Sequence, residues 1–363
     1  PSLRASAANL LSNPQTTFLL HLPTELYQQI HSFEGGKLFL PADIELQLRT
    51  RLRSINAEQG TRFTLSRIAG DLAGRLIGQA EDPVDIDLIC GVDPAHTPAM
   101  FYYAPIGHQL SSLHQQDNNR LLQAAEIAAT YVELDQSIRV GSRLQVATQY
   151  VERLFAIQSA RLREMARRSA VEAFHTEFTL FVYQILALAT GYRPVTAPFE
   201  RRTDFDLLRG TLWISEKESR SGLAARVVVL PDLVIRQVAL YDEHLAYMAN
   251  LMALEQSPHV EKFRAALRGD GPYLLMCHHG RCVPIRPRLL VQAMSDRFPI
   301  PLNWGRHFLR TRLRDEGIPG HLVNAWLGHE KFGDEAGGPW SGLSYGDLKA
   351  VARSLNAVFS TLG

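Results

Sequence analysis

Six polar side chains in the C-terminal half of the chain are of types that can carry out chemistry on a phosphate ester. Arginines are planar, bidentate phosphate ligands, histidine and lysine transfer protons, and a tyrosine hydroxyl can act as a nucleophile. Two guanidinium groups can also stabilise the charge that develops on the non-bridging oxygens. The set therefore meets the needs of metal-free phosphoryl transfer. In chain order it is Arg193, Lys217, His307, Arg310, His329 and Tyr345.

The local sequence around the first two residues predicts where they lie. A glycine ends the apolar run 170–190, and it places Arg193 just past the end of a helix. The β-rich runs 212–216 and 226–230 predict a hairpin. Lys217 then lies at the end of the first strand of that hairpin.

The two histidines accompany predicted helices. His307 and Arg310 are three residues apart, which places them on one face of a helix expected over 305–315. His329 follows a second expected helix, 321–327, directly after its terminal glycine. These helices would hold the imidazoles and the second arginine.

The rest of the chain is mainly helical by its pattern. Apolar residues recur at helical spacing, and Pro, Gly and Asp cluster where loops are expected. The pattern thus predicts an α+β, mainly helical fold with small β-hairpins. Further helices are expected at 44–55, 64–77, 121–134, 144–168, after Pro231 to about 254, and 346–362; strands at 37–40, 273–276 and 283–285; loops at 81–98 and 333–342.

The order of these pieces resembles that of the tyrosine recombinases, the phage-integrase family, whose catalytic residues run Arg, Lys, His-x-x-Arg, His or Trp, and Tyr. The resemblance covers residues 166–363. The segment ATGYR at 189–193 is similar to the TGLR turn of that family, and RVVVLP at 226–231 is similar to its strand after the hairpin lysine. Gly328 and His329 match its glycine-histidine pair.

The resemblance implies site-specific cleavage and rejoining of DNA without a metal or nucleotide cofactor, because a covalent link conserves the bond energy. Tyr345 would attack a phosphate, form a 3′-phosphotyrosyl link and release a 5′-hydroxyl. The other implied roles are phosphate ligation by Arg193 and Arg310, general acid catalysis by Lys217, uptake of the nucleophile's proton by His307 and a hydrogen bond to the phosphate from His329.

The chain departs from the family pattern at two places. The family often has a carboxylate three residues after its first arginine, where this chain has Thr196. The sixteen residues from His329 to Tyr345 exceed the usual spacing, and the excess falls in the Gly-rich segment 333–342. Such a tether could bring Tyr345 to its own site or to that of a neighbour.

Composition and charge limit the partners. With 46% apolar residues the chain can build a core, which argues against disorder. The net charge of +1 is low for a nucleic-acid-binding domain, so any DNA affinity would depend on a local basic face. The arginines expected to contact DNA phosphates are Arg306, Arg312 and Arg314, beside the His-x-x-Arg motif.

Cysteine content and hydropathy bear on the expected cellular compartment, on metal binding and on membrane insertion. Three cysteines cannot form a disulfide framework, so a reducing, cytoplasmic setting is expected. The run Cys277–Cys282 raises a zinc interpretation, but structural zinc usually needs two ligand pairs, and we expect no metal. No secretory signal is visible, and the most apolar stretch, 178–190, is too short to cross a bilayer.

Three domains are expected: an N-terminal domain at 1–118, a helical core-binding or linker region at 119–165, and the catalytic domain at 166–363. Residues 66–76 align by pattern with the segment that begins at His307. This suggests that the N-terminal domain is a degenerate, partial copy of the catalytic fold, with Ser66 and Ala69 in the places of histidine and arginine.

The expected partner is double-stranded DNA carrying a specific recombination site, bound by a homo-oligomer such as a tetramer and without a membrane. The apolar stripe of helix 346–362 fits either contact with a neighbouring protomer or packing within its own chain. Two other functions remain open: a type IB topoisomerase-like enzyme that relaxes DNA as a monomer, and a non-catalytic DNA-binding accessory protein.

Overall fold

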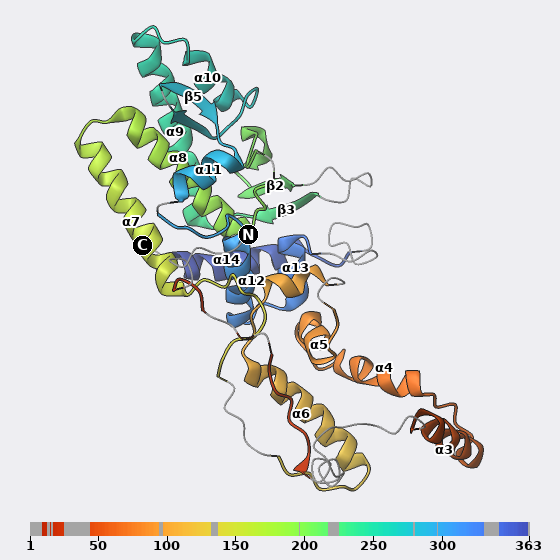
Figure 1. Cartoon of the computed structure of the whole chain (residues 1–363). Helices are drawn as coiled ribbons and strands as arrows, with labels where there is room; N and C mark the ends of the chain where they lie inside the picture. The colour runs from red at the N-terminus through yellow and green to blue at the C-terminus, as the bar shows by residue number, and fades with distance from the viewer. Residues whose placement is uncertain are drawn as a thin grey trace. The chain divides into compact units, whose positions relative to one another are not determined.

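The computed structural model describes residues 9–12, 15, 17–24, 44–93, 97–131, 137–195, 197–216, 225–278, 280–295, 297–329 and 341–361. The chain forms two units (Figure 1). The larger unit combines three separate stretches, 1–14, 101–104 and 142–363, and the smaller unit holds 15–100 and 105–141. Lys217, Thr196 and the expected strand 37–40 lie outside the described residues.

The smaller unit is helical. Its helices are α3 (Ile44–Gln59), α4 (Leu65–Leu76), α5 (Pro83–Ile89) and α6 (Gly107–Ala124), and the 3-10 helix η2 (Pro98–Tyr102) runs from this unit into the larger one. A small core joins α4, α5 and α6 through Leu76, Ile86, Ile89 and Leu110. Beside it, the Arg75 guanidinium binds the buried carboxylate of Asp117 at 2.9 Å. An ion pair thus ties α4 to α6.

The larger unit is built around one central helix. It contains α7 (Thr148–Arg167), α8 (Val171–Thr190), η3 (Arg202–Asp204), α9 (Asp232–Leu254), α10 (Val260–Arg268), α11 (Pro287–Met294), α12 (Trp304–Asp315), α13 (Gly320–Leu327) and α14 (Tyr345–Thr361). Helix α8 is apolar over most of its surface, and its second half is almost entirely buried. A helix that is apolar on all sides belongs inside a core. Accordingly, α7, α9, α12 and strand β4 all pack on α8 (Figure 1).

Two small antiparallel sheets complete the larger unit. The first has the order β1 (Phe205–Asp206), β2 (Thr211–Ser215) and β3 (Ala225–Val229), with Ile214 opposite Arg226. The second pairs β4 (Leu275–His278) with β5 (Arg281–Pro284). Alternate residues of β2 are buried, which fits a sheet with one face on the core. The fold is therefore α+β and mainly helical, as the sequence predicts.

Helix α14 packs on its own chain. Its apolar stripe is buried in the core of the larger unit, and the helix contacts α9, α12, α13 and β3. Of the two interpretations of this stripe, packing within the chain is the one observed. The expected homo-oligomer through helix 346–362 stays a prediction.

Several elements differ from their expected bounds. The region 81–98, expected as a loop around a short apolar segment, contains α5, because Asp82 caps the helix by accepting from the Val84 amide and Pro83 occupies its first turn. The helix expected at 121–134 is instead the end of α6, which stops at Ala124. The helix expected at 144–168 begins only at Thr148.

The unit boundaries also fall at other places than the expected domain limits of 118 and 165, since α6 lies in the smaller unit and α7 packs on α8. The repeat hypothesis expects a topological match of the N-terminal domain to residues 200–345, and it stays a prediction because its strand 37–40 lies outside the described residues. The described residues of the smaller unit show only isolated bridges, such as that between Gln15 and Val140.

Candidate active site

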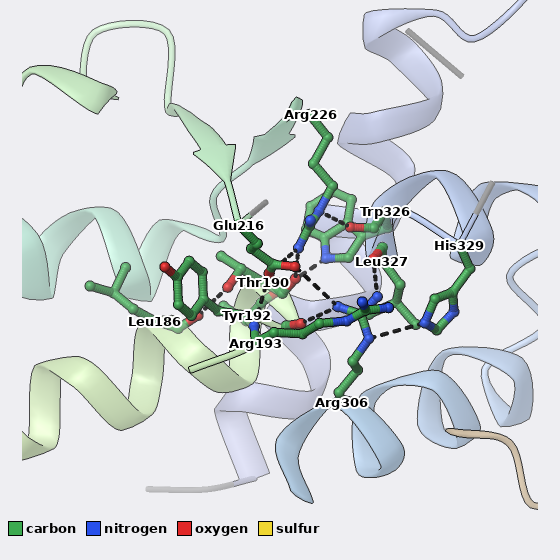
Figure 2. A network of polar contacts seen from close by, with 12 residues as sticks. Leu186, Thr190, Tyr192, Arg193, Glu216, Arg226, Arg306, Trp326, Leu327 and His329 are labelled. Carbon is green, nitrogen blue, oxygen red and sulfur yellow. Dashed lines mark hydrogen bonds and ion pairs between the residues drawn. The ribbon is translucent and has the colours of Figure 1, made fainter. Parts of the chain in front are cut away.

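Arg306 is the centre of a polar network between the ends of α8 and α13. Its guanidinium is buried, with the residue 1% exposed. Nε donates to Nε2 of His329 at 3.0 Å, Nη1 donates to the Gly191 carbonyl at 2.7 Å, and Nη2 donates to the Leu327 carbonyl (Figure 2). All three nitrogens are held, so the guanidinium is fixed in position.

The end of α8 needs a glycine for this arrangement. Gly191 has a φ of +61°, in the left-handed region, and a Cβ at this position would overlap the Leu327 side chain. The tight turn lets the Gly191 carbonyl meet Arg306 and places Arg193 next to the network. The glycine stop in the sequence therefore has a direct role in positioning two arginines.

Glu216 lies opposite these arginines at the end of β2. Its Oε1 accepts from the Arg193 amide at 2.8 Å and from Nη2 of Arg226 at 3.0 Å, and its Oε2 lies 3.8 Å from Nη1 of Arg306 (Figure 2). Arg226 also donates to the Trp326 carbonyl at 2.8 Å. One carboxylate thus pairs with two guanidiniums, those of Arg226 and Arg306, and with the backbone of Arg193, which leaves an excess of positive charge. The sequence analysis missed Glu216, although it precedes Lys217 directly.

Burial and the positive charges of the neighbouring arginines lower the pKa values of Arg306 and His329. Burial, and then the nearby Arg193 charge, lowers the pKa of Arg306 to about 9. Burial, and then the charge of Arg306 followed by those of Arg310 and Arg193, holds the pKa of His329 well below its usual value. His329 is therefore neutral at pH 7, and since its Nε2 accepts from Arg306, its proton is on Nδ1.

Two buried donors in this cluster have no hydrogen-bond acceptor among the described residues. They are Nδ1 of His329 and Nε of Arg193. Buried donors are nearly always paired in proteins, so such groups need an explanation. An anion bound between them would satisfy both and would offset the excess positive charge. We call Arg193, Arg306 and His329 the cationic cluster.

The predicted pair His307 and Arg310 makes its hydrogen bonds with residues outside the cationic cluster. Nδ1 of His307 lies 2.6 Å from Oγ of Ser142, and burial lowers its pKa to about 4. Arg310 lies one turn further along α12 and donates to Oδ1 of Asn324 at 2.6 Å. The arginine that joins His329 to the end of α8 is Arg306.

Arg306, rather than the expected Arg310, contacts both His329 and the end of α8, whereas Arg310 contacts Asn324. The two residues are four apart and share a helix face, so the helical pattern alone could not choose between them. Three positions before Arg306 lies Asn303, and its Nδ2 lies 3.3 Å from Nε2 of His307.

The other predicted residues lie apart from the cluster or are engaged elsewhere. Arg312 pairs with Glu316 at 2.6 Å, and Arg314 donates to the Ile318 carbonyl at 2.5 Å. Tyr345 begins α14 and is 45% exposed, and its hydroxyl donates to the Arg209 carbonyl at 2.7 Å. Its hydroxyl is thus held by a backbone group rather than by the cationic cluster.

No protein-family model, curated protein or solved structure matches the chain. Over the described ranges, no group of three or more His, Cys, Asp or Glu side chains could hold a metal ion. None of the helices in these ranges is long and apolar enough to cross a bilayer. The two cysteines of the Cys277–Cys282 run lie with their sulfurs 3.6 Å apart.

Buried neutral histidines predict a loss of stability in acid. Burial lowers the pKa of His175 to about 3, and that of His307 to about 4. The unfolded chain takes up these protons near pH 6.5. It therefore binds more protons than the folded chain below that pH, and the free energy of unfolding falls as the pH drops from about 6.5 towards 4.

For His175 alone, which is fully buried, this loss should be about 2 kcal/mol between pH 7 and pH 5. Urea unfolding of the wild type and His175→Gln at both pH values measures it. We expect the variant to lose less stability on acidification than the wild type. Equal losses would contradict the assignment.

Proposed function

We propose that the chain is a DNA strand transferase that cleaves and rejoins DNA through a 3′-phosphotyrosyl intermediate, as its resemblance to tyrosine recombinases implies. The observation that supports this most is the cationic cluster. It combines a fixed buried guanidinium, a second arginine and a neutral imidazole, with two buried donors that meet no acceptor in the described part of the chain. Preorganised donors of this kind stabilise the charge on a phosphoryl group in attack.

In this proposal the cluster holds the scissile phosphate. Arg193 and Arg306 bind the non-bridging oxygens, and Nδ1–H of His329 donates to one of them. Oη of Tyr345 attacks phosphorus, the bond from phosphorus to the 5′-oxygen breaks, and the 5′-oxygen takes a proton from the general acid, Lys217. The proton of Tyr345 passes to the neutral imidazole of His307. Rejoining reverses these steps.

Tyr345 has to leave its present contact for this reaction. Its hydroxyl must give up the Arg209 carbonyl before it can approach a phosphate in the cationic cluster. Because it is half-exposed at the start of α14, the movement costs little buried surface. The same contact is the observation that favours a second candidate, a DNA-binding protein that does not cleave.

Covalent trapping tests the proposal. Labelled, nicked duplexes from the ends of the genetic element that encodes the chain are mixed with the protein and separated on a denaturing gel. We expect a covalent adduct with the wild type and a loss of at least about a thousandfold with Tyr345→Phe. DNA binding by this variant should stay within about twofold, because it loses one exposed hydrogen bond.

Tyr247→Phe is the matched control, since Tyr247 is also exposed, at 53%, and lies on α9. It should form the adduct at the wild-type rate. DNA binding without an adduct in any protein would reject the strand transferase and favour the non-cleaving candidate. An adduct accompanied by relaxation of any supercoiled plasmid, with no recombinant product, would assign the type IB topoisomerase-like activity.

A further inference from the structure

The cationic cluster is covered by a tyrosine from far away in the chain. The ring of Tyr102 stacks on the His329 ring, with centroids 4.8 Å apart and planes 22° from parallel. Its centroid is 4.6 Å from that of the His307 ring. The guanidinium carbons of Arg306 and Arg193 lie 5.0 Å and 5.8 Å from the centre of the same ring. One side chain therefore touches every member of the cluster.

The residues next to Tyr102 are attached to α12. The Tyr103 ring, buried at 3% exposure, lies 5.2 Å from the guanidinium carbon of Arg310. The amide of Ala104 donates to Oγ1 of Thr311 at 3.1 Å, and the amide of Ser142 donates to the Tyr103 carbonyl at 2.9 Å. We call residues 101–104 the strap. It is built into the larger unit by successive contacts.

The orientation of Tyr102 shows what it does to the cluster. The arginine guanidiniums meet the face of its ring, which is the geometry of a cation–π contact. A phosphate held by Arg193, Arg306 and His329 together would need the volume that this ring fills.

Tyr102 also leaves the cluster electrostatically incomplete. Neither Tyr102 nor any other described residue supplies an acceptor to the buried donors on Arg193 and His329. A phosphate diester would supply an acceptor to both. The ring thus occupies the cluster with weaker interactions than an anion would make.

We propose that the strap is an autoinhibitory occupant of the cationic cluster, which a phosphate of DNA displaces when it binds. This rests on the proposed function in so far as the competitor is DNA. Both ends of the strap continue into the smaller unit, at residues 100 and 105. Displacement of the strap is therefore coupled through the chain itself to that unit.

Binding and trapping by the full chain test the proposal. Fluorescence anisotropy with a labelled, nicked duplex compares the wild type with Tyr102→Ala and Tyr102→Phe. We expect Tyr102→Ala to bind about tenfold more tightly, which corresponds to about 1.4 kcal/mol, and to form the adduct faster. Tyr102→Phe should behave as the wild type, because it keeps the ring face. Phe101→Ala, at a strap residue that is 55% exposed, should also bind as the wild type.

The possible outcomes distinguish failure of the autoinhibition proposal from failure of the proposed strand transferase activity. Equal or weaker DNA binding by a folded Tyr102→Ala would overturn the autoinhibitory role of the strap, whether or not adducts form. If Tyr102→Ala does not fold, Tyr102→Val, which also vacates most of the volume of the ring and loses the cation–π contact, replaces it with the same expectation. Tighter binding with no adduct in any protein would support the strap and reject the strand transferase. An adduct lost in Tyr102→Phe and kept in Tyr345→Phe would overturn the strap and identify Tyr102 as the nucleophile.

Discussion

Arg306→Lys is expected to slow formation of the covalent adduct by roughly a thousandfold, whereas Arg310→Lys slows it by about tenfold. A lysine ammonium cannot reproduce a planar guanidinium that bonds His329, Gly191 and Leu327 together. Loss of one preorganised donor in an active site alone costs two to three powers of ten in rate. Single-turnover trapping on nicked DNA measures both rates.

Arg306 is buried, so its effect on folding has to be separated from its effect on the reaction. Thermal unfolding of each variant reports stability, and Arg306→Ala with added guanidinium ion provides a chemical rescue. A cluster that binds phosphate through Arg306 should recover part of its rate, which a variant that is only unstable would not do. A greater loss in Arg310→Lys than in Arg306→Lys would favour the role expected for Arg310.

Glu216→Gln is expected to lower the free energy of unfolding by about 3 kcal/mol. The carboxylate is buried among Arg193, Arg226 and Arg306, and removing one partner of a buried ion pair leaves the others uncompensated. Chemical denaturation at pH 7 measures the change. We also expect added sulfate to stabilise this variant more than the wild type, because an anion can replace the lost charge.

The control for this prediction is Glu261→Gln. Glu261 also pairs with an arginine, Arg268, at 2.5 Å, but its side chain is 66% exposed. Exposed pairs contribute little, so its stability should change by less than about 1 kcal/mol. Similar losses in the two variants, or an equal response to sulfate, would show that Glu216 does not balance the arginines.

Local patterns predicted the elements that hold the site. The apolar run that ends at Gly191, the hairpin around Lys217 and the helices that precede His329 all appear close to their expected positions. Each of these depends on a neighbouring stretch of chain: a glycine stop, a β-rich run or a helical period. Arg306 and Arg310 satisfy the same helical pattern, and only packing on the end of α8 distinguishes them, so the role expected for Arg310 stays a prediction that the two lysine variants test.

Tyr102 could not be recognised as part of the site from the sequence. Its partners lie on α12 and just after α13, so no local period connects them. Glu216 was missed for a similar reason, since its role depends on three arginines that come together only in the folded unit. Tertiary contacts of this kind follow from burial and charge balance rather than from spacing.

The larger unit is built from stretches that are far apart in the sequence, so these stretches leave the ribosome at different times during synthesis. Ala104 and its partner Thr311 are 207 residues apart. At synthesis rates of about 5–20 residues per second, α12 follows the strap from the ribosome after roughly 10–40 s. Tyr102 is thus already present when Arg306 and His329 emerge. Under the proposed function, Tyr102 can therefore occupy the cationic cluster of a growing chain before any DNA phosphate reaches it.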